Sequence, residues 1–467
     1  MRYKYIWVLL LITSLAFFSN CKKDKVEKPV TTAATVSHDF ESGSIGEITK
    51  ISNTEWVLSL ADDNNNPDLP DSWRNWWYVK MENLPTDSVI QITLNNRGWP
   101  YYYLPVYSYD QQEWHRFSEE EVSQIEDSEL IINKRFLNTS VWIARFYPYT
   151  FTNLETYISS LSNSPFINIE TPGYSQNGKP VYLIKVTDSD YPASDKKRVF
   201  MHARTHPAET PSSFLIEGMI NYLLESSSET DDILSGFEFY IFPMQNVDGV
   251  TIGNYRSTPQ TENLEVMWYY DVDNPLSLTD EAPDEVDIVH NYAMDLMNDG
   301  GPPITMALNL HASNSEPDIR PFFYPHFGYE SQGYDSVEAI LWENQIALIN
   351  ILASHHGPNM IEPLPSEGGS SFASKTYPES WWWVNYKEQV LAMTMEMTYG
   401  RAGYSPRWIV PNDLRDLGKS LVLSIRDYYD VHYKRIKLLP ETGRDIHNSN
   451  LKYPELYPPY DNDELKK

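Results

Sequence analysis

Hydrophobic residues follow two different patterns along this chain, and the change falls near residue 147. Between residues 38 and 146, short aromatic and β-branched runs are separated by Asn, Asp, Pro and Gly, as in SVIQITLNN, YYYLPVYSY and ELIINKRF. Alternation of this length is typical of short antiparallel strands in a sandwich. We therefore expect an antiparallel β-sandwich domain over residues 38–146.

Beyond residue 147 the apolar runs alternate between strand and helix patterns. KKRVFMHAR, FEFYIFPM, ITMALNL and VLAMTMEM predict strands. A helix is expected after Thr210 as N-cap, with Pro211 at its first position. SVEAILWENQIALINILASH and NDLRDLGKSLVLSIRDYYDVHYKR predict two more helices. This alternation predicts an α/β domain with a largely parallel sheet over residues 147–436, followed by a C-terminal surface tail over residues 437–467.

The first apolar run, YIWVLLLITSLAFF, has the features of an export signal. It follows two basic residues and is too short to cross a hydrocarbon core of ~30 Å. Cys21 is the only cysteine, and LAFFSNC resembles the lipidation box of bacterial lipoproteins. We expect a signal peptide over residues 1–20, lipid on Cys21 and a flexible tether over residues 21–37. The expected location is the bacterial cell envelope, in the periplasm or on the cell surface, with the lipid as the only membrane contact.

Composition narrows the possible partners. The formal net charge is -29, so we expect no nucleic-acid partner, because phosphate contacts need a basic face. Apolar residues make up 41% and aromatic residues 14% of the chain, which is enough for packed cores. The aromatic segment WRNWWYV in the first domain has two interpretations, a sugar-binding platform or packing in a core or between domains.

The segment HARTHPAET, residues 202–210, carries candidate metal ligands. His202 and His206 lie four positions apart, but Pro207 favours an extended conformation before it. Strand spacing then puts the two rings ~13 Å apart, too far to share an ion bound at ~2 Å. His206 and Glu209 form the better pair, although HxxE also occurs by chance as a loop residue and a solvated acid.

Two further polar residues stand at the ends of predicted strands. His311 follows ITMALNL, and Glu396 interrupts the apolar run VLAMTMEM. In open α/β sheets, sites lie at the carboxyl ends of strands, so these side chains should share a rim with His206 and Glu209. Two histidines and one glutamate with an open fourth position are a catalytic zinc set, which leaves the second acid free to act as a base.

Several ordered motifs resemble the zinc carboxypeptidase family, and within it the cytosolic carboxypeptidase branch. They are THPAETPSSFLIEGMINYL, FPMQNVDGVTIGNYR, NLH and TMEMTYG, with DFESGSIG and WIARFYPYTFTNLETYI resembling the accessory β-domain of the branch and its junction with the catalytic domain. The similarity spans about residues 38–435. It implies a zinc carboxypeptidase-like mixed sheet with flanking helices, preceded by the β-sandwich.

The resemblance also implies roles for individual residues. Zn²⁺ would be bound by His206, Glu209 and His311, Glu396 would be the general acid/base, and Arg256 would polarise the scissile carbonyl. Tyr377 is a candidate for the tyrosine that the family places over the substrate, with a surface aromatic as the alternative. His326, His355 and His356 are not expected to contact the metal.

One stretch departs from the family pattern. The family usually has an Asn and an Arg here that bind the terminal carboxylate of the substrate, whereas NLEVMW has Glu265 and Val266 at those positions. If the anchor is lost, substrates with a cationic or neutral group next to Glu265 should be preferred. The alternative is a local misalignment of this stretch, with the anchor supplied elsewhere, for example by Arg320 or Arg401.

Three functions follow from these observations. The first is a zinc metallocarboxypeptidase that hydrolyses an amide bond near a peptide C-terminus. The second is a related zinc amidase acting on cell-wall peptides or acylated amino acids. The third is a non-catalytic binding lipoprotein that relies on its aromatic first domain, against which the complete ligand set and Glu396 argue.

Overall fold

The computed structural model describes residues 33–125, 129–271, 273–364, 367–368 and 376–438. The export signal, Cys21, most of the predicted tether and nearly all of the predicted tail lie outside these ranges and stay predictions. Contacts group the chain from Ala34 onward into one compact unit, so they do not test the predicted domain boundaries. Across the described ranges, no helix has the length and apolar character needed to span a membrane.

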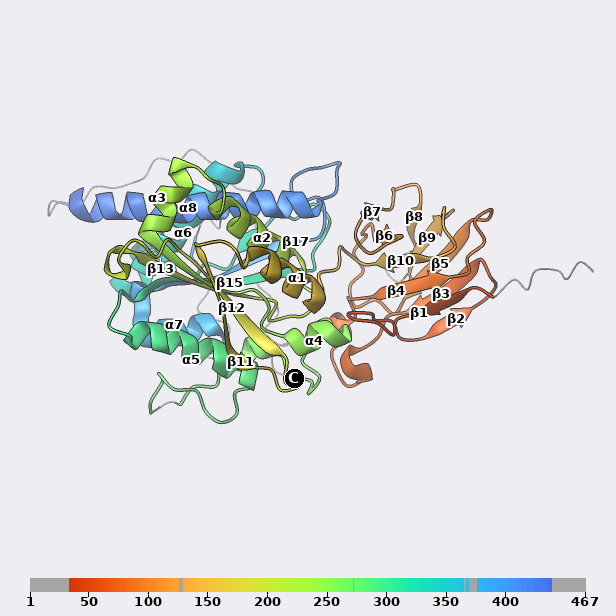
Figure 1. Ribbon diagram of the computed structural model, residues 1–467, viewed down its shortest axis with the longest axis horizontal. Helices are drawn as coiled ribbons and strands as arrows, with labels where there is room; N and C mark the ends of the chain where they lie inside the picture. Colours follow the sequence, from red (N-terminus) through yellow and green to blue (C-terminus); the bar gives the residue numbers. More distant parts are fainter. Residues whose placement is uncertain (1–32, 126–128, 272, 365–366, 369–375, 439–467) are drawn as a thin grey trace, which may run out of the picture. The chain divides into compact units, whose positions relative to one another are not determined.

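Two five-stranded sheets form the first part of the chain (Figure 1). Apolar residues of both sheets, among them Trp56, Ile92, Val79 and Ile143, share one core, which makes the pair a sandwich. In spatial order the strands are β1 (Thr35–Ser37), β4 (Tyr78–Glu82), β10 (Val141–Ala144), β6 (Val106–Ser108) and β7 (Trp114–Arg116), then β2 (Ile48–Lys50), β3 (Glu55–Ser59), β5 (Ile90–Asn95), β9 (Glu129–Lys134) and β8 (Val122–Ile125).

The predicted antiparallel sandwich is confirmed, with one exception in its pairing. Strands β3 and β5 run parallel. A parallel pair needs a crossover connection, and here the chain between the two strands passes through β4 in the other sheet. The two short 3-10 turns η1 (Asp63–Asn65) and η2 (Asp71–Trp73) lie in this crossover.

A seven-stranded mixed sheet carries the second part of the chain. Its order is β11 (Ile167–Tyr174), β12 (Pro180–Val186), β14 (Phe237–Phe242), β13 (Lys197–Ala203), β15 (Ile304–Ser313), β17 (Leu391–Thr398) and β16 (Phe322–Phe323). The four strands from β14 to β17 are parallel and correspond to the four predicted apolar runs, so the largely parallel sheet is confirmed. The sequence did not predict the antiparallel strands β11, β12 and β16. In β11 all side chains are half-buried or exposed, and only Ile167 and Ile169 alternate with polar residues.

Helices cover both faces of this sheet (Figure 1). One face carries α2 (Pro211–Leu223), α3 (Ser228–Gly236), α6 (Ser336–His356) and α8 (Pro411–Leu438), and the other carries α5 (Asp284–Asn298) and α7 (Pro378–Tyr386). The remaining helices are α1 (Phe151–Leu161) and α4 (Val247–Ile252). Gly218 of α2 and Gly418 of α8 let these two helices approach closely, since a Cβ on either would lie 2.1 Å from a backbone oxygen of the other helix.

The predicted helices are confirmed, but the cap of α2 differs from the expected one. Pro211 is the first helical residue, as predicted. Thr210 precedes it with helical backbone angles, φ -57° and ψ -25°, and its side chain accepts no hydrogen bond from the helix. A capping hydroxyl needs an extended backbone at its own residue to reach the N–H groups of the first turn, which explains the difference.

Candidate metal centre

Parallel pairing of β15 and β17 brings His311 and Glu396 together. The two residues are register partners, and Asn309 and Thr394 are partners two positions earlier. Because side chains alternate between the faces of a strand, these four side chains project from the same face. The core of the site is therefore set by strand register.

The loop after β13 supplies the other two metal-binding candidates. It begins at Arg204, which has a left-handed backbone (φ 56°) and is 2% exposed. The guanidinium of Arg204 donates to the Pro207 carbonyl through Nε (2.8 Å), to the Tyr149 carbonyl (3.0 Å) and to Ser213 Oγ (2.9 Å). These bonds fold the loop back on itself and turn His206 and Glu209 toward β15.

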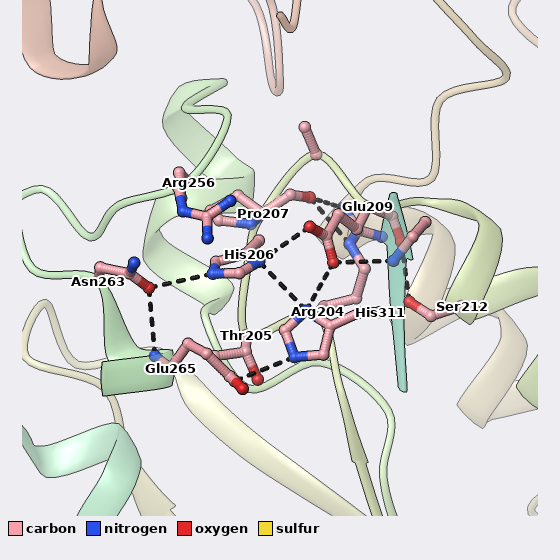
Figure 2. A network of polar contacts seen from close by, with 12 residues as sticks. Arg204, Thr205, His206, Pro207, Glu209, Ser212, Arg256, Asn263, Glu265 and His311 are labelled. Carbon is pink, nitrogen blue, oxygen red and sulfur yellow. Dashed lines mark hydrogen bonds and ion pairs between the residues drawn. The ribbon is translucent and has the colours of Figure 1, made fainter. Parts of the chain in front are cut away.

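Three side chains converge where this loop meets β15 (Figure 2). His206 Nδ1 lies 2.8 Å from Glu209 Oε1, and His311 Nδ1 lies 2.8 Å from Glu209 Oε2. The two Nδ1 atoms are 3.1 Å apart. All three residues are buried, and their ligand atoms lie within 4.8 Å of one another. The structure thus brings together the three residues that the sequence singled out as metal ligands.

The other ring nitrogens decide what this cluster can bind. His206 Nε2 lies 3.0 Å from Asn263 Oδ1, and His311 Nε2 lies 3.0 Å from Glu265 Oε2. Both partners are oxygens that can accept a hydrogen bond, so rings that bind a metal through Nδ1 would donate their Nε2 protons to Asn263 and Glu265. Two imidazole nitrogens and a carboxylate that converge within 4.8 Å form a donor set that zinc prefers.

The buried side chains of the cluster shift one another's pKa values. Burial raises the pKa of Glu209, but His206 and His311 outweigh burial and hold that pKa well below its usual range. Burial lowers the pKa of His311, but the carboxylates of Glu265 and Glu209 outweigh it and hold the pKa well above its ordinary value. For His206, burial and the charge of Arg256 lower the pKa, so this ring stays neutral and able to bind a metal.

Glu396 stands beside the cluster as a fourth, uncommitted carboxylate. Its Oε2 atom is shielded from solvent and has no hydrogen-bond partner among the described residues. Burial, followed by the charge of Glu209, raises the pKa of Glu396 to about 8. A buried carboxylate without a partner costs stability, and such groups cluster at functional sites.

Arg256 reaches the same site from the loop after α4. Figure 2 shows its guanidinium next to His206 and Pro207. It also lies over the ring of Trp73, with 5.8 Å between Cζ and the ring centroid. Its positive charge lowers the pKa of Glu396 as well as that of His206, which places it within electrostatic reach of the predicted base.

Comparison with known families agrees with this geometry. Residues 36–146 match the cytosolic carboxypeptidase N-terminal domain, and residues 154–321 match the zinc carboxypeptidase family. These two matches identify a zinc carboxypeptidase domain in this chain and, before it, the N-terminal domain of the cytosolic branch. The zinc site predicted at His206, Glu209 and His311 is confirmed by this match together with the buried cluster.

Relatives and solved structures support the same assignment. Bovine cytosolic carboxypeptidase 3 is 26% identical over 66% of this chain and 31% of its own length, and cytosolic carboxypeptidase 6 of Caenorhabditis elegans is 25% identical over 65% of this chain and 67% of its own length. The first of these matches thus spans about a third of the relative. A metallo-carboxypeptidase from Burkholderia cenocepacia has the same fold, with a TM-score of 0.70 and 19% identity over 86% of this chain and 100% of its own, and a putative carboxypeptidase A from Shewanella denitrificans gives 0.69 and 22% over 85% and 99%.

Glu265, predicted from the sequence to replace the family's asparagine, lies against the zinc site. Glu265, at the start of the turn η4 (Leu264–Val266), is 6% exposed. Besides bonding His311, its carboxylate accepts two hydrogen bonds from Asn309 Nδ2, at 2.9 and 3.1 Å. A second acid, Glu379 in the first turn of α7, is 4% exposed and accepts a bond from Thr394 Oγ1 (2.6 Å). Burial, followed by the charge of Glu265, raises the pKa of Glu379 to about 7.

The alternative anchors, Arg320 and Arg401, are engaged elsewhere. Arg320 forms an ion pair with Glu362 (3.0 Å). Arg401 forms ion pairs with Glu119 (3.0 Å) and Asp318 (3.3 Å). Each guanidinium is therefore held by carboxylates that are not part of the zinc cluster.

Tyr377 and the remaining histidines take other positions. Tyr377 directly precedes α7. The carbonyl of the neighbouring Thr376 accepts a hydrogen bond from the backbone N–H of Trp268 (3.0 Å), so this segment lies near η4. Its role over the substrate stays a prediction. His202 bonds Gln245 (3.1 Å) rather than joining the metal cluster, His355 pairs with Asp427 (2.7 Å), and burial lowers the pKa of His326 to about 3.

Sequence reasoning missed several residues of this site. Asn309 is a polar residue inside an apolar strand pattern, so it could have been noticed. Asn263 lies in the NLEVMW stretch, but nothing in the pattern indicates that its oxygen faces His206. Arg204 and Glu379 gave no local signal, because their partners come from other parts of the chain.

Proposed function

We propose that this chain is a zinc-dependent metallocarboxypeptidase that hydrolyses an amide bond near a peptide C-terminus by attack of water. The observation that carries the proposal is a buried His–Glu–His cluster with an uncommitted carboxylate, Glu396, projecting from the neighbouring strand. Metal ligands alone could serve a structural site, whereas a free acid beside an open metal position is what hydrolysis requires.

The proposed roles follow from the groups present. Zinc bound by the three ligands would polarise the scissile carbonyl and lower the pKa of a water molecule. Glu396 accepts the proton of the attacking water and passes it to the leaving amine, which a carboxyl group with a raised pKa can do near neutral pH. Arg256 stabilises the negative charge that develops on the carbonyl oxygen. Asn263 and Glu265 hold the two histidine rings in the ligating tautomer.

We further propose that the substrate places a positive group just beyond the scissile bond. Two buried acids lie near the zinc cluster, since Glu265 bonds His311 and its charge raises the pKa of Glu379. Asn309 Oδ1 is a buried acceptor without a hydrogen-bond partner among the described residues. With Leu264 and Trp268 aligned to the family motif, Val266 stands where the family has its carboxylate-binding arginine. A free carboxylate would be repelled there, whereas a basic side chain or the second amine of a diamino acid would complement the two acids.

Released products from a mixed peptide and cell-wall peptide pool test both proposals. Zinc-loaded protein is expected to release Lys, Arg or diamino acids faster than Phe or Leu. A charge-assisted bond contributes about 1.5–3 kcal/mol, so the difference in kcat/KM should be ~10- to 100-fold. Mass spectrometry of the pool, with and without a zinc chelator, gives the preference directly. Products only from cell-wall peptides or acylated amino acids would favour the zinc amidase instead, and no zinc-dependent product would favour a binding lipoprotein.

Two variants separate the roles of the acids. Glu379→Gln keeps an acceptor for Thr394, removes the charge and does not touch a zinc ligand, so the preference for basic residues should fall while the zinc content is unchanged. The double change Glu265→Asn with Val266→Arg should shift the preference toward ordinary C-termini, with zinc measured alongside because Glu265 bonds His311. Rapid release of Phe or Leu by the wild type, unaffected by either variant, would contradict the cationic preference.

We also propose that the chain is exported and held on the bacterial envelope by lipid on Cys21. The support is the short apolar run YIWVLLLITSLAFF followed by the single cysteine. Cys21→Ser should move the protein from the detergent phase to the aqueous phase on phase separation, because the variant has no residue to carry the lipid. Several acyl chains on Cys21 would anchor the wild type stably, whereas one chain binds membranes only marginally. Equal partitioning of the variant and the wild type would indicate a plain secreted protein or an uncleaved signal, and the size of the protein distinguishes these two outcomes.

A further inference from the structure

An aspartate of the β-sandwich part, Asp63, is bound to the loop that carries Arg256. Its carboxylate accepts hydrogen bonds from the backbone N–H groups of three consecutive residues, Tyr255 (2.6 Å), Arg256 (2.8 Å) and Ser257 (2.8 Å). A fourth bond comes from Ser257 Oγ (3.0 Å). Asp63 is only 4% exposed, so water does not compete for these donors.

The neighbouring Asn64 fixes the two ends of the same loop. It has a left-handed backbone (φ 55°). Its side chain accepts a hydrogen bond from Asn254 Nδ2 (2.9 Å) and donates one to the Thr258 carbonyl (2.9 Å). A further bond reaches Thr261 Oγ1 (3.0 Å). From the same crossover, Trp73 supplies the ring that faces the Arg256 guanidinium. Both the backbone and the side chain of Arg256 are thus contacted by residues 63–73.

The loop held in this way leads directly into the metal centre. The Tyr255 carbonyl accepts a bond from the N–H of Ala208, which lies between His206 and Glu209 (3.1 Å). A few residues further on, Asn263 and Glu265 bond the two histidine ligands. A shift of residues 255–257 would therefore move Arg256 relative to the cluster, and misplacement by about 1 Å of a group in a catalytic site can cost ~10²-fold in rate.

We propose that Asp63 is a positioning residue for Arg256, so that the β-sandwich part completes the active site of the catalytic part. This inference rests on the proposed function, because it assumes that Arg256 acts on the substrate. Three consecutive backbone N–H groups and one hydroxyl donate to the buried carboxylate of Asp63, which fixes the backbone of residues 255–257. Arg256 then needs no reorganisation when charge develops on the substrate.

A double-mutant cycle tests the proposal on the fastest substrate of the peptide pool. Asp63→Ala is expected to lower kcat at least ~10-fold with little change in KM. In an Arg256→Ala background, which itself costs ~10²-fold, the same change should have less than about a twofold effect. Asp62→Ala is the matched control, because Asp62 lies in the same crossover but pairs with Arg74 (2.5 Å), and its kcat should equal that of the wild type. Equal losses from Asp63→Ala in both backgrounds would overturn the proposal.

Asp63→Asn keeps the test decisive if the alanine variant does not fold. An amide offers one oxygen acceptor and turns its NH₂ toward a backbone donor, so hydrogen exchange in a peptide covering residues 254–261 should speed up at unchanged zinc content. This measurement needs no substrate, so it can fail or succeed independently of the proposed activity. Unchanged exchange in that peptide would also overturn the positioning role, whereas loss of activity in the wild type alone would count only against the proposed function.

Discussion

Replacing Glu396 with glutamine is expected to abolish nearly all turnover while leaving the fold and the zinc content intact. A neutral amide has nearly the same shape as the carboxylate but cannot take the proton of the attacking water. General acid–base catalysis contributes ~10²–10⁴-fold, so kcat should fall by at least that factor. Because Glu396 Oε2 has no hydrogen-bond partner among the described residues, the change breaks no bond that supports the fold.

Steady-state kinetics together with metal analysis and thermal unfolding measure this outcome. Glu343→Gln is a suitable control, since it makes the same chemical change at an exposed position of α6 and should leave all three measurements as in the wild type. A Glu396→Gln protein with kcat near that of the wild type would show that another group is the base. A low kcat accompanied by loss of zinc would assign Glu396 to the metal site instead.

Replacing both His206 and His311 with alanine should eliminate zinc binding. The wild type is expected to bind one equivalent of zinc through the three converging side chains, and the variant would retain only the Glu209 carboxylate. One carboxylate does not hold zinc against dialysis, because most of the ligand set is gone. Since ligand binding stabilises the folded state by mass action, added zinc should raise the unfolding temperature of the wild type and not of the variant.

Metal analysis after dialysis gives the direct measurement. His202→Gln is the informative control, because His202 lies four positions before His206 yet bonds Gln245 instead of the cluster. That variant should keep its zinc. Full zinc content in the double variant, or its loss in His202→Gln, would contradict the assignment of the ligands.

The sequence anticipated the zinc ligands because local chemistry and strand order place them. Pro207 favours an extended chain before it, so His202 and His206 cannot share one ion. The proximity of His206 and Glu209 follows from a tight loop before a helix. His311 and Glu396 end neighbouring parallel strands, and the carboxyl ends of parallel strands lie on one edge of a sheet. The structure confirms this expectation, because His311 of β15 and Glu396 of β17 are register partners.

The partners of these residues were outside the reach of such patterns. Glu265 was expected to face the substrate, and the structure adds a bond to His311, which lies 46 positions away. Glu379 meets Thr394 only because α7 packs against β17. Hydrophobic periodicity specifies which face of an element is buried, but it contains no information on which polar groups meet once the faces are packed.

The sequence by itself determined the two-part architecture, the parallel strands and long helices, and the identity of the three ligands and the nearby acid. The architecture depends on local periods, whereas the assignment of the ligands and the acid also depends on the motifs that resemble the zinc carboxypeptidase family. Only the tertiary structure decided which groups the histidine nitrogens contact, which acids are buried beside the cluster, and which residues hold the loop that carries Arg256. The hydrogen bond that the Ser257 N–H donates to Asp63 joins residues 194 positions apart. Contacts at such separation depend on how the completed sheets and helices pack, because buried polar groups must pair with whichever donors and acceptors the packing brings to them.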